Sequence, residues 1–337
     1  MGSRQAVDQT NLFQQLAALV AARWPLEPAS IQPIKVRENA VFAVHLRDGA
    51  KVVMRVHRRG YHSDAALHSE CTWMRALADF GIDVPRHVLS NTGNSFESVH
   101  IEGFEGERQV DVFHWIQGQQ LGSVEGGVDT SARSIGDIYR EVGRLAGRVH
   151  NHSCTWAAPA NFKRHAWNVA GLAGDNPLWG CFWELDALSG AQRALFMRLK
   201  QMLWRDLNEF GTTADRYSLI HADLVPENIL VDGTHLQVID FDDAGFGWHL
   251  FELATSLYFI RREPVYQEAR DALIEGYRQV RPLPEAHLAR LPMFLAARGS
   301  TYLGWVHTRR SEPAAQEMVP QLIEFAVAAA EDYLRAM

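Results

Sequence analysis

The sequence predicts an α+β protein with two lobes: a mostly antiparallel five-stranded sheet that carries one helix, followed by a mostly helical lobe. Two observations support this fold class. Strand-like alternation dominates the first 116 of the 337 residues, and helical periodicity dominates the remainder. The predicted lobes are 1–116 and 128–337. The segment 117–127 is rich in glycine and lacks apolar periodicity, so we expect it to be the hinge between them.

The N-terminal lobe begins with a helix candidate that stops before Pro25. Residues 31–57 then alternate as strands do, and Asp48-Gly49 predicts a hairpin turn between two of them. A helix is expected over 64–80, with Gly81 as its C-terminal cap. Further short β-rich segments complete the predicted sheet; they are 84–89, 96–102 and 108–116.

The C-terminal lobe is predicted to be helical with one interruption. Residues 218–240 return to strand and turn character inside this helical context. A β-hairpin at such a place indicates that its loops have a function. The helices are expected at about 134–150, 191–210, 249–261, 264–279, 285–307 and 314–336.

Charge and cysteine content exclude several classes of protein. The net charge of −7 would repel a nucleic-acid backbone, and no run of basic residues offsets it, so we expect no nucleic-acid partner. The three cysteines lack the paired spacing of zinc or redox motifs. The apolar run 16–22 is too short to span a bilayer. We therefore expect a soluble cytoplasmic protein without a membrane partner; the sequence does not indicate its oligomeric state.

The interrupting hairpin carries the densest polar chemistry of the chain. His221 and Asp223 follow one short apolar strand, and Asn228 lies in the next turn. Asp240 ends a later apolar strand and is followed by Asp242 and Asp243. Two carboxylates and an amide oxygen are hard ligands of the kind that Mg²⁺ takes. A remaining carboxylate can accept a hydroxyl proton. This combination is typical of phosphoryl transfer, in which the protein positions the reactants and neutralises charge.

The stretches 221–233 and 238–248 resemble the catalytic loop and the metal-binding motif of the aminoglycoside phosphotransferase and kinase-like superfamily. They are similar in particular to the branch with stress-response kinases and homoserine-kinase-like enzymes. The resemblance covers about residues 35–260. It implies a bilobal protein-kinase-like fold and an ATP- and Mg²⁺-dependent transfer of the γ-phosphate to an alcohol group.

The resemblance also assigns roles to single residues. Asp223 matches the catalytic aspartate that receives the hydroxyl proton. Asn228 and Asp240 match the metal ligands. His221 matches the position that braces the catalytic loop, and Asp242 is a candidate support for the metal ligands.

The N-terminal lobe should supply a cation for the nucleotide phosphates. Val53 and Arg55 share one face of a strand that resembles the kinase strand with the adenine-covering residue and the phosphate-pairing lysine. Here Arg55 replaces that lysine and keeps its charge. We expect Glu70, on the following helix, to pair with Arg55, with Glu38 as the poorer alternative.

Adenine is expected to dock against the strand that precedes the hinge. The backbone groups of Val112, Phe113 and His114 are the candidate contacts. No glycine-rich motif precedes the strand at Ala40, so the sequence predicts no glycine-rich phosphate loop there.

Several features have alternative interpretations. Asp240-Phe-Asp242 also fits a D-x-D phosphatase, but only helical patterns follow it. Gly245-Phe-Gly247 is predicted to be a turn and helix entry rather than a dinucleotide site. Glu252 either tethers the catalytic loop or lies on the surface. The aromatic-rich segment 156–183 either packs in the core or forms a substrate platform.

The predicted function is therefore the phosphorylation of a small-molecule hydroxyl, such as that of an aminoglycoside or an amino alcohol. A protein Ser/Thr kinase of the stress-response type and a nucleotide-binding pseudokinase are the alternatives.

Overall fold

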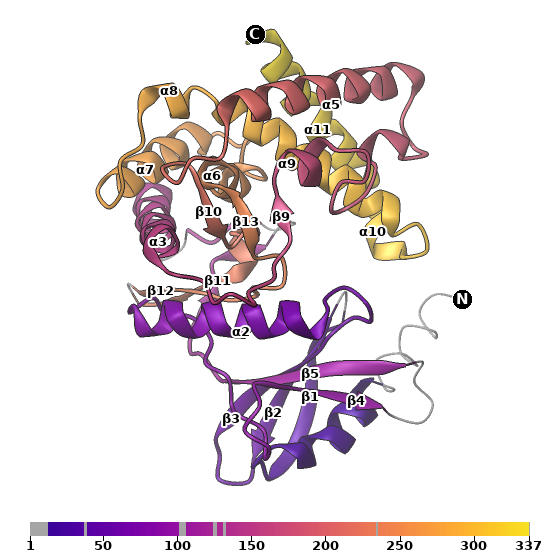
Figure 1. The fold of residues 1–337 in the computed structure, drawn as a ribbon, viewed down its shortest axis with the longest axis vertical. Coiled ribbons are helices and arrows are strands. Elements are labelled where there is room, and N and C mark those ends of the chain that lie inside the picture. Colours follow the sequence, from indigo (N-terminus) through magenta and orange to yellow (C-terminus); the bar gives the residue numbers. More distant parts are fainter. Residues whose placement is uncertain are drawn as a thin grey trace. The chain divides into compact units, whose positions relative to one another are not determined.

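The protein is described from a computed structural model, which covers residues 13–36, 39–100, 106–123, 127–130, 133–233 and 235–336. The chain divides into two compact units (Figure 1). The first unit comprises Met1–Gly118 and Ala158–Lys163; the second comprises Gln119–Ala157 and Arg164–Met337. The chain therefore passes between the units after Gly118, after Ala157 and after Lys163. A hinge at 117–127 stays a prediction.

The first unit contains the predicted five-stranded antiparallel sheet, in the order β1-β2-β3-β5-β4. The helix α2 (Asp64–Asp79) begins after Ser63, whose side chain accepts a hydrogen bond from the backbone N–H of Ala66. The strands are β1 (Pro28–Val36), β2 (Ala40–Leu46), β3 (Lys51–Val56), β4 (Phe96–His100) and β5 (Glu107–His114).

The two faces of this sheet have different chemistry. On one face, Met54 and Val56 of β3 pair with Val112 and Val110 of β5 in a buried apolar core. The residues between them point to the opposite face, because side chains alternate along a strand. There α2 contributes Leu67 and Cys71 to a cluster with Phe96, and Figure 1 shows α2 lying across the sheet.

One predicted strand of this unit is wrong. Residues 84–89 form only an isolated bridge, between His87 and Phe113. Pro85 supplies no N–H for a ladder, and only a short part of β5 is left for this segment to pair with. The fifth strand is instead β1, which begins at Pro28 and pairs with β2.

The second unit is mostly helical, as predicted. Its helices are α3 (Ile135–Thr155), α4 (Val169–Ala173), α5 (Gly190–Phe210), α6 (His249–Leu257), α7 (Tyr266–Arg278), α8 (Glu285–Leu288), α9 (Leu291–Thr308), α10 (Pro313–Glu317) and α11 (Val319–Arg335). The single helix expected over 285–307 is two helices, α8 and α9. Pro292 lies in the first turn of α9, a position where its missing N–H costs nothing.

Small sheets interrupt these helices. The predicted strands of the hairpin are confirmed as β10 (Tyr217–Ile220), β11 (Ile229–Asp232) and β12 (His235–Val238). Gly245-Phe-Gly247, expected to be a turn and helix entry, lies in a strand, β13 (Gly245–Trp248), which pairs with β10 on one side and with β9 (Ala166–Trp167) on the other. The helix α6 begins directly after this strand. The remaining short strands are β6 (Gln119–Gln120), β7 (Gly122–Ser123) and β8 (Gly127–Val128).

The helices α3 and α7 approach each other closely. A Cβ atom on Gly143 of α3 would overlap the backbone carbonyl of Leu273, and one on Gly276 of α7 would overlap the carbonyl of Arg140. Both positions therefore need glycine for the two backbones to touch. Within the described ranges, no helix combines the length and the apolar character needed to cross a membrane.

Candidate functional site

The central residue of the site in the first unit is Arg55, which lies opposite Asp111 in the pairing of β3 with β5. The Arg55 Nε donates to Asp111 Oδ1 at 3.1 Å and Nη2 donates to Oδ2 at 2.6 Å. Nη2 also donates to Glu70 Oε1 on α2 at 2.8 Å. All three side chains are buried. The expected ion pair of Arg55 with Glu70 is thus present, whereas the alternative partner Glu38 lies outside the described residues.

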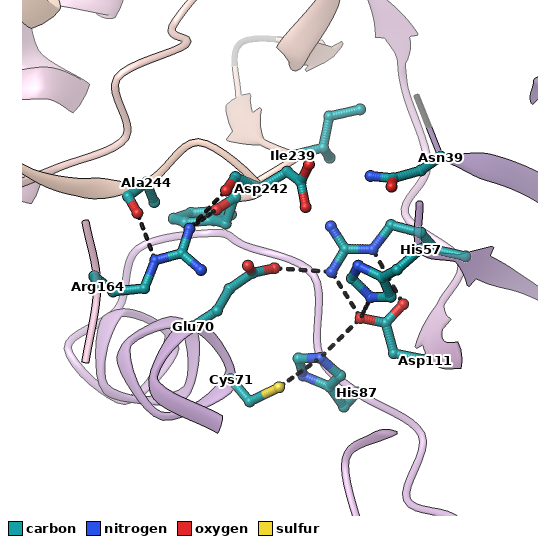
Figure 2. A network of polar contacts seen from close by, with 12 residues as sticks. Asn39, His57, Glu70, Cys71, His87, Asp111, Arg164, Ile239, Asp242 and Ala244 are labelled. Carbon is teal, nitrogen blue, oxygen red and sulfur yellow. Dashed lines mark hydrogen bonds and ion pairs between the residues drawn. The ribbon is translucent and has the colours of Figure 1, made fainter. Parts of the chain in front are cut away.

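Asp111 is the residue that the sequence analysis missed here. Its carboxylate also lies 3.1 Å from His57 Nε2 and 3.9 Å from His87 Nε2, and Figure 2 shows it between these two histidines. Burial alone would raise the pKa of Asp111, but the charges of Arg55 and His57 outweigh burial and hold the pKa below its usual range. Asp111 is therefore a carboxylate that fixes the Arg55 guanidinium.

The same network ends in two neutral groups. Burial lowers the pKa of His87 to about 4, so its imidazole is neutral at pH 7. The sulfur of Cys71 lies 3.4 Å from His87 Nε2, and burial raises the pKa of this thiol (Figure 2). A protonated, buried thiol is a poor nucleophile, so Cys71 has a structural role.

The other candidate nucleotide contacts lie in the same two strands. Val53 is opposite Phe113, and the Arg55 guanidinium lies 5.2 Å from the centre of the Phe113 ring. The carbonyl of Val112 accepts a hydrogen bond from Val88, and the His114 N–H donates to the Arg86 carbonyl at 2.9 Å. The role of these residues in binding adenine stays a prediction.

In the second unit, the loop 221–228, which resembles a kinase catalytic loop, follows directly after β10. Ala222 has a φ of 66°, in the left-handed region, which costs a non-glycine residue about 1–3 kcal/mol. The Asp223 N–H donates to His221 Nδ1 at 3.3 Å. The other ring nitrogen, Nε2, must then carry the proton and donate to the Ile239 carbonyl at 3.0 Å. His221 therefore braces the loop against the chain segment that leads to Asp240, as expected.

Glu252 of α6 fixes this loop from inside the unit. Its Oε1 accepts from the His221 N–H at 2.9 Å and its Oε2 from the Ala222 N–H at 2.7 Å. The residue is 1% exposed, so the alternative of a surface role is wrong. Burial raises the pKa of Glu252, while the two backbone donors oppose that shift.

Asp223 is held through both of its carboxylate oxygens. Oδ1 accepts from Arg298 Nη2 at 2.6 Å and Oδ2 from Asn228 Nδ2 at 2.7 Å. The side chain remains 23% exposed, so it can be reached from solvent. Loss of solvation raises the pKa of Asp223 to about 6; Arg298 opposes this rise and Asp243 adds to it. Asp223 is therefore an oriented carboxylate that is mostly ionised at neutral pH.

Asn228 and Asp240 are brought together by the β11–β12 hairpin. The Ile239 N–H donates to the Asn228 carbonyl at 2.9 Å, which extends the ladder and places Asp240 next along the chain. The Asn228 amide nitrogen donates to Asp223, so its amide oxygen is the atom suited to a cation. Asp240 is exposed and has a φ of 64°. An amide oxygen and a carboxylate fit Mg²⁺.

Asp242 is buried in the turn that follows Asp240. The side chain of Arg164 binds the backbone carbonyls of this turn. The Arg164 guanidinium donates to the carbonyls of Asp242 at 2.6 Å and Ala244 at 2.6 Å (Figure 2). It also reaches the Phe241 carbonyl at 3.1 Å. Arg164 was not singled out from the sequence. A supporting role of Asp242 in metal binding stays a prediction.

Three rings of the aromatic-rich segment are buried inside the second unit. Trp167 and Phe182 are at most 1% exposed, and Trp179 is 9% exposed. The Trp179 Nε1 donates to Asp243 Oδ1 at 3.2 Å and the Trp167 Nε1 donates to the Asp243 carbonyl at 2.9 Å, so two rings of the segment reach the turn after Asp240. Core packing is therefore the better of the two interpretations for these three rings.

Arg298 of α9 is the second functional candidate that the sequence analysis missed. It is fully buried and binds Asp223 directly. A signal was present, because Arg298 places a charge directly after the apolar run 293–297. A charged residue among buried helical positions needs a buried partner. The sequence alone does not identify that partner.

Comparisons with known proteins identify the family of the chain. Residues 30–287 match the model of the phosphotransferase enzyme family. The amicoumacin kinase of Bacillus subtilis (strain 168) is 25% identical over 305 residues, which is 87% of this chain and 84% of that protein. A homoserine kinase of Parvibaculum lavamentivorans is 26% identical over 268 residues, covering 78% of this chain and 74% of that protein.

Solved structures show the same fold. A microcompartment-associated aminopropanol kinase superposes with a TM-score of 0.83 and 31% identity, covering 96% of this chain and 98% of that one. An amicoumacin kinase in complex with AMP-PNP, Ca²⁺ and Ami has a TM-score of 0.76 and 21% identity, covering 97% of this chain and 96% of that one. The chain therefore belongs to the phosphotransferase enzyme family and has its kinase-like fold.

Proposed function

We propose that this phosphotransferase moves the γ-phosphate of ATP to the hydroxyl of a small amino alcohol, in a reaction that depends on Mg²⁺. The observation that carries the proposal is the state of Asp223: a partly exposed carboxylate, oriented through both oxygens by Arg298 and by the amide of Asn228. This is the arrangement that phosphoryl transfer to an alcohol requires.

In the proposed reaction, Asp223 accepts a hydrogen bond from the acceptor hydroxyl and so aligns its oxygen. As this oxygen bonds to the γ-phosphorus, the bond from phosphorus to the leaving oxygen breaks, ADP departs and the hydroxyl proton passes to Asp223. Asn228 and Asp240 would hold the metal ion. When bound, Mg²⁺ neutralises negative charge on the phosphates.

We assign the nucleotide contacts to the first unit. Arg55 would bind phosphate oxygens, with Asp111 and Glu70 fixing its orientation. An arginine can do so with two donors, although its geometry differs from that of lysine. Val53 would cover adenine, and the strand residues 112–114 would line its edge.

Two observations support an acceptor that carries an amine. The relatives include kinases named for aminopropanol and homoserine, which combine an amino group with a hydroxyl. In this chain, the charges of Asp243 and Glu227 are close enough to raise the pKa of Asp223, after the larger effects of desolvation and Arg298. An acidic neighbourhood of this kind favours a substrate ammonium group over a neutral sugar.

A screen for ADP release tests the proposal. The purified protein is incubated with Mg·ATP and aminopropanol, homoserine, aminoglycosides, choline, neutral sugars or a protein mixture. We expect acceptor-dependent ADP release with an amino alcohol and its loss on addition of EDTA. Label transferred to protein bands would favour a Ser/Thr kinase instead. Mg·ATP binding without transfer to any acceptor would favour a pseudokinase.

A further inference from the structure

Arg298 lies where a charge is least expected, inside the second unit. Its side chain is 0% exposed, and the guanidinium is surrounded by aromatic rings. The guanidinium carbon lies 4.4 Å from the centre of the Tyr302 ring, 4.8 Å from Trp179 and 5.7 Å from Phe251. These rings attract the cation and limit the directions in which its N–H groups can point.

The donors of Arg298 are directed at two consecutive residues of the catalytic loop. Nη1 donates to the Ala222 carbonyl at 3.1 Å and Nη2 donates to Asp223 Oδ1 at 2.6 Å. Nη2 also donates to the hydroxyl oxygen of Tyr302 at 2.8 Å, one turn along α9. One planar group therefore fixes both the backbone and the side chain of the loop.

Arg298 and Glu252 bind the two backbone polar groups of the same residue, Ala222. Glu252 accepts from the Ala222 N–H at 2.7 Å, while Arg298 donates to the Ala222 carbonyl. Ala222 is one of the two non-glycine residues with a positive φ in the described ranges, so its conformation depends on such contacts. The turn that aims Asp223 is thus held by a buried anion from α6 and a buried cation from α9.

We propose that Arg298 is a positioning residue for the phosphoryl transfer: it fixes the Ala222 turn and the rotation of the Asp223 carboxylate, so that this carboxylate faces the acceptor hydroxyl. The inference rests on the proposed function. Arg298 holds Oδ1 and Asn228 holds Oδ2, so the carboxylate cannot turn about its Cβ–Cγ bond without losing a charge-assisted hydrogen bond. Because Arg298 is fully buried, it acts through Asp223 rather than on the substrate.

A lysine at this position would keep the charge but not the geometry. Arg298 reaches Ala222 and Asp223 with two different nitrogens of one rigid plane. A lysine has a single nitrogen on a flexible chain and cannot reproduce this fork. Arg298→Lys therefore separates orientation from charge.

The experiment compares Arg298→Lys with Arg309→Lys in steady-state assays with the amino alcohol found in the acceptor screen. Arg309 follows α9, is also buried and lies 4.5 Å from the Trp305 ring, but it binds the Trp305 carbonyl rather than the catalytic loop. For Arg298→Lys we expect kcat to fall about 10- to 100-fold, with the KM values for Mg·ATP and acceptor within about threefold. Arg309→Lys should keep kcat within about twofold.

A second variant, Tyr302→Phe, keeps the aromatic ring and removes the hydroxyl whose oxygen accepts a hydrogen bond from Arg298 Nη2. It should lower kcat about three- to tenfold at unchanged KM, and it carries the test if Arg298→Lys does not fold. Unchanged kcat in the folded variants, or an equal loss in Arg298→Lys and Arg309→Lys, would overturn the positioning role alone. A wild-type protein that phosphorylates none of the acceptors would overturn the proposed function and this role with it.

Discussion

Replacement of Asp223 by asparagine removes the proposed proton acceptor at nearly constant shape. We expect Asp223→Asn to lower kcat by about 10² to 10⁴, or about 3–5 kcal/mol of transition-state stabilisation. Mg·ATP binding should persist, because Asn228 and Asp240 are intact. Steady-state kinetics and titration calorimetry measure the two effects separately. Turnover within threefold of the wild-type value would show that Asp223 is not the base.

Asp111 fixes Arg55 with two hydrogen bonds inside the first unit. Asp111→Asn leaves the buried guanidinium with less compensating charge, and breaking a buried ion pair typically costs about 3–5 kcal/mol. We expect a loss of this size in the free energy of unfolding, measured by urea denaturation. Asp79→Asn, at an exposed position at the end of α2, should change it by less than about 0.5 kcal/mol. Equal stability of the two variants would contradict this prediction.

At the level of single residues, the acidic and amide residues of the hairpin could be predicted from the sequence. Most of the charged side chains that orient the site residues could not. Glu70 could be predicted because it lies on the helix next to the strand that carries Arg55. Asp111 could not, because its position opposite Arg55 depends on the pairing register of β3 with β5. Arg298 is 75 residues away from Asp223 along the chain, and only the folded unit brings them together.

Among the elements of the second unit, α3 and α7 depend on glycine for their contact. Gly143→Ala would push its new methyl group into the Leu273 carbonyl, so the helices must separate or bend. We expect a loss of about 1–3 kcal/mol in stability, as for other overpacked sites. The matched control is Gly190→Ala at the start of α5, where a Cβ meets no atom within 4 Å. If thermal melting gave the same midpoint for both variants, the close approach would not be required.

Element types were predictable wherever apolar periodicity was long. The helices α3, α5 and α7 lie within a few residues of the predicted ranges, apart from the C-terminal end of α3 at Thr155. Two short segments, 84–89 and Gly245-Phe-Gly247, were not predicted correctly, because their structure is decided by pairing partners. The segment Gly245–Trp248 carries two glycines and a turn-like composition, yet it is a strand because β10 and β9 flank it.

The whole molecule contains several histidines that burial keeps neutral. Burial lowers the pKa of His87 to about 4 and holds those of His150 and His249 well below the ordinary value of 6.5. In the unfolded chain these groups protonate near pH 6.5. The unfolded state therefore binds more protons below that pH, and stability falls as the pH drops from about 6.5 toward 4.

For His87 alone the contribution is about 3 kcal/mol over this window. We expect the thermal midpoint of the wild-type protein to decrease from pH 7 to pH 4.5. The decrease should be smaller in His87→Gln and unchanged in His100→Gln, whose side chain is exposed. Identical slopes in all three proteins would show that His87 does not stay neutral in the fold.

The two-lobed architecture could be predicted because strand and helix patterns are segregated along the chain. The membership of Ala158–Lys163 in the first unit could not, because these residues follow a long helix of the second unit and carry no strand or helix pattern. A contact fixes them there: the Lys163 N–H donates to the Ser69 hydroxyl at 2.8 Å.

The chain returns to the first unit at Ala158–Lys163, and this has a consequence for limited proteolysis. A protease that nicks the backbone between residues 119 and 127 leaves Ala158–Lys163 on the larger fragment, still docked on the smaller one. We expect the nicked halves to co-elute in size-exclusion chromatography and to separate only in denaturant. For the same reason, a gene split at this point should yield two polypeptides that reassemble when they are co-expressed.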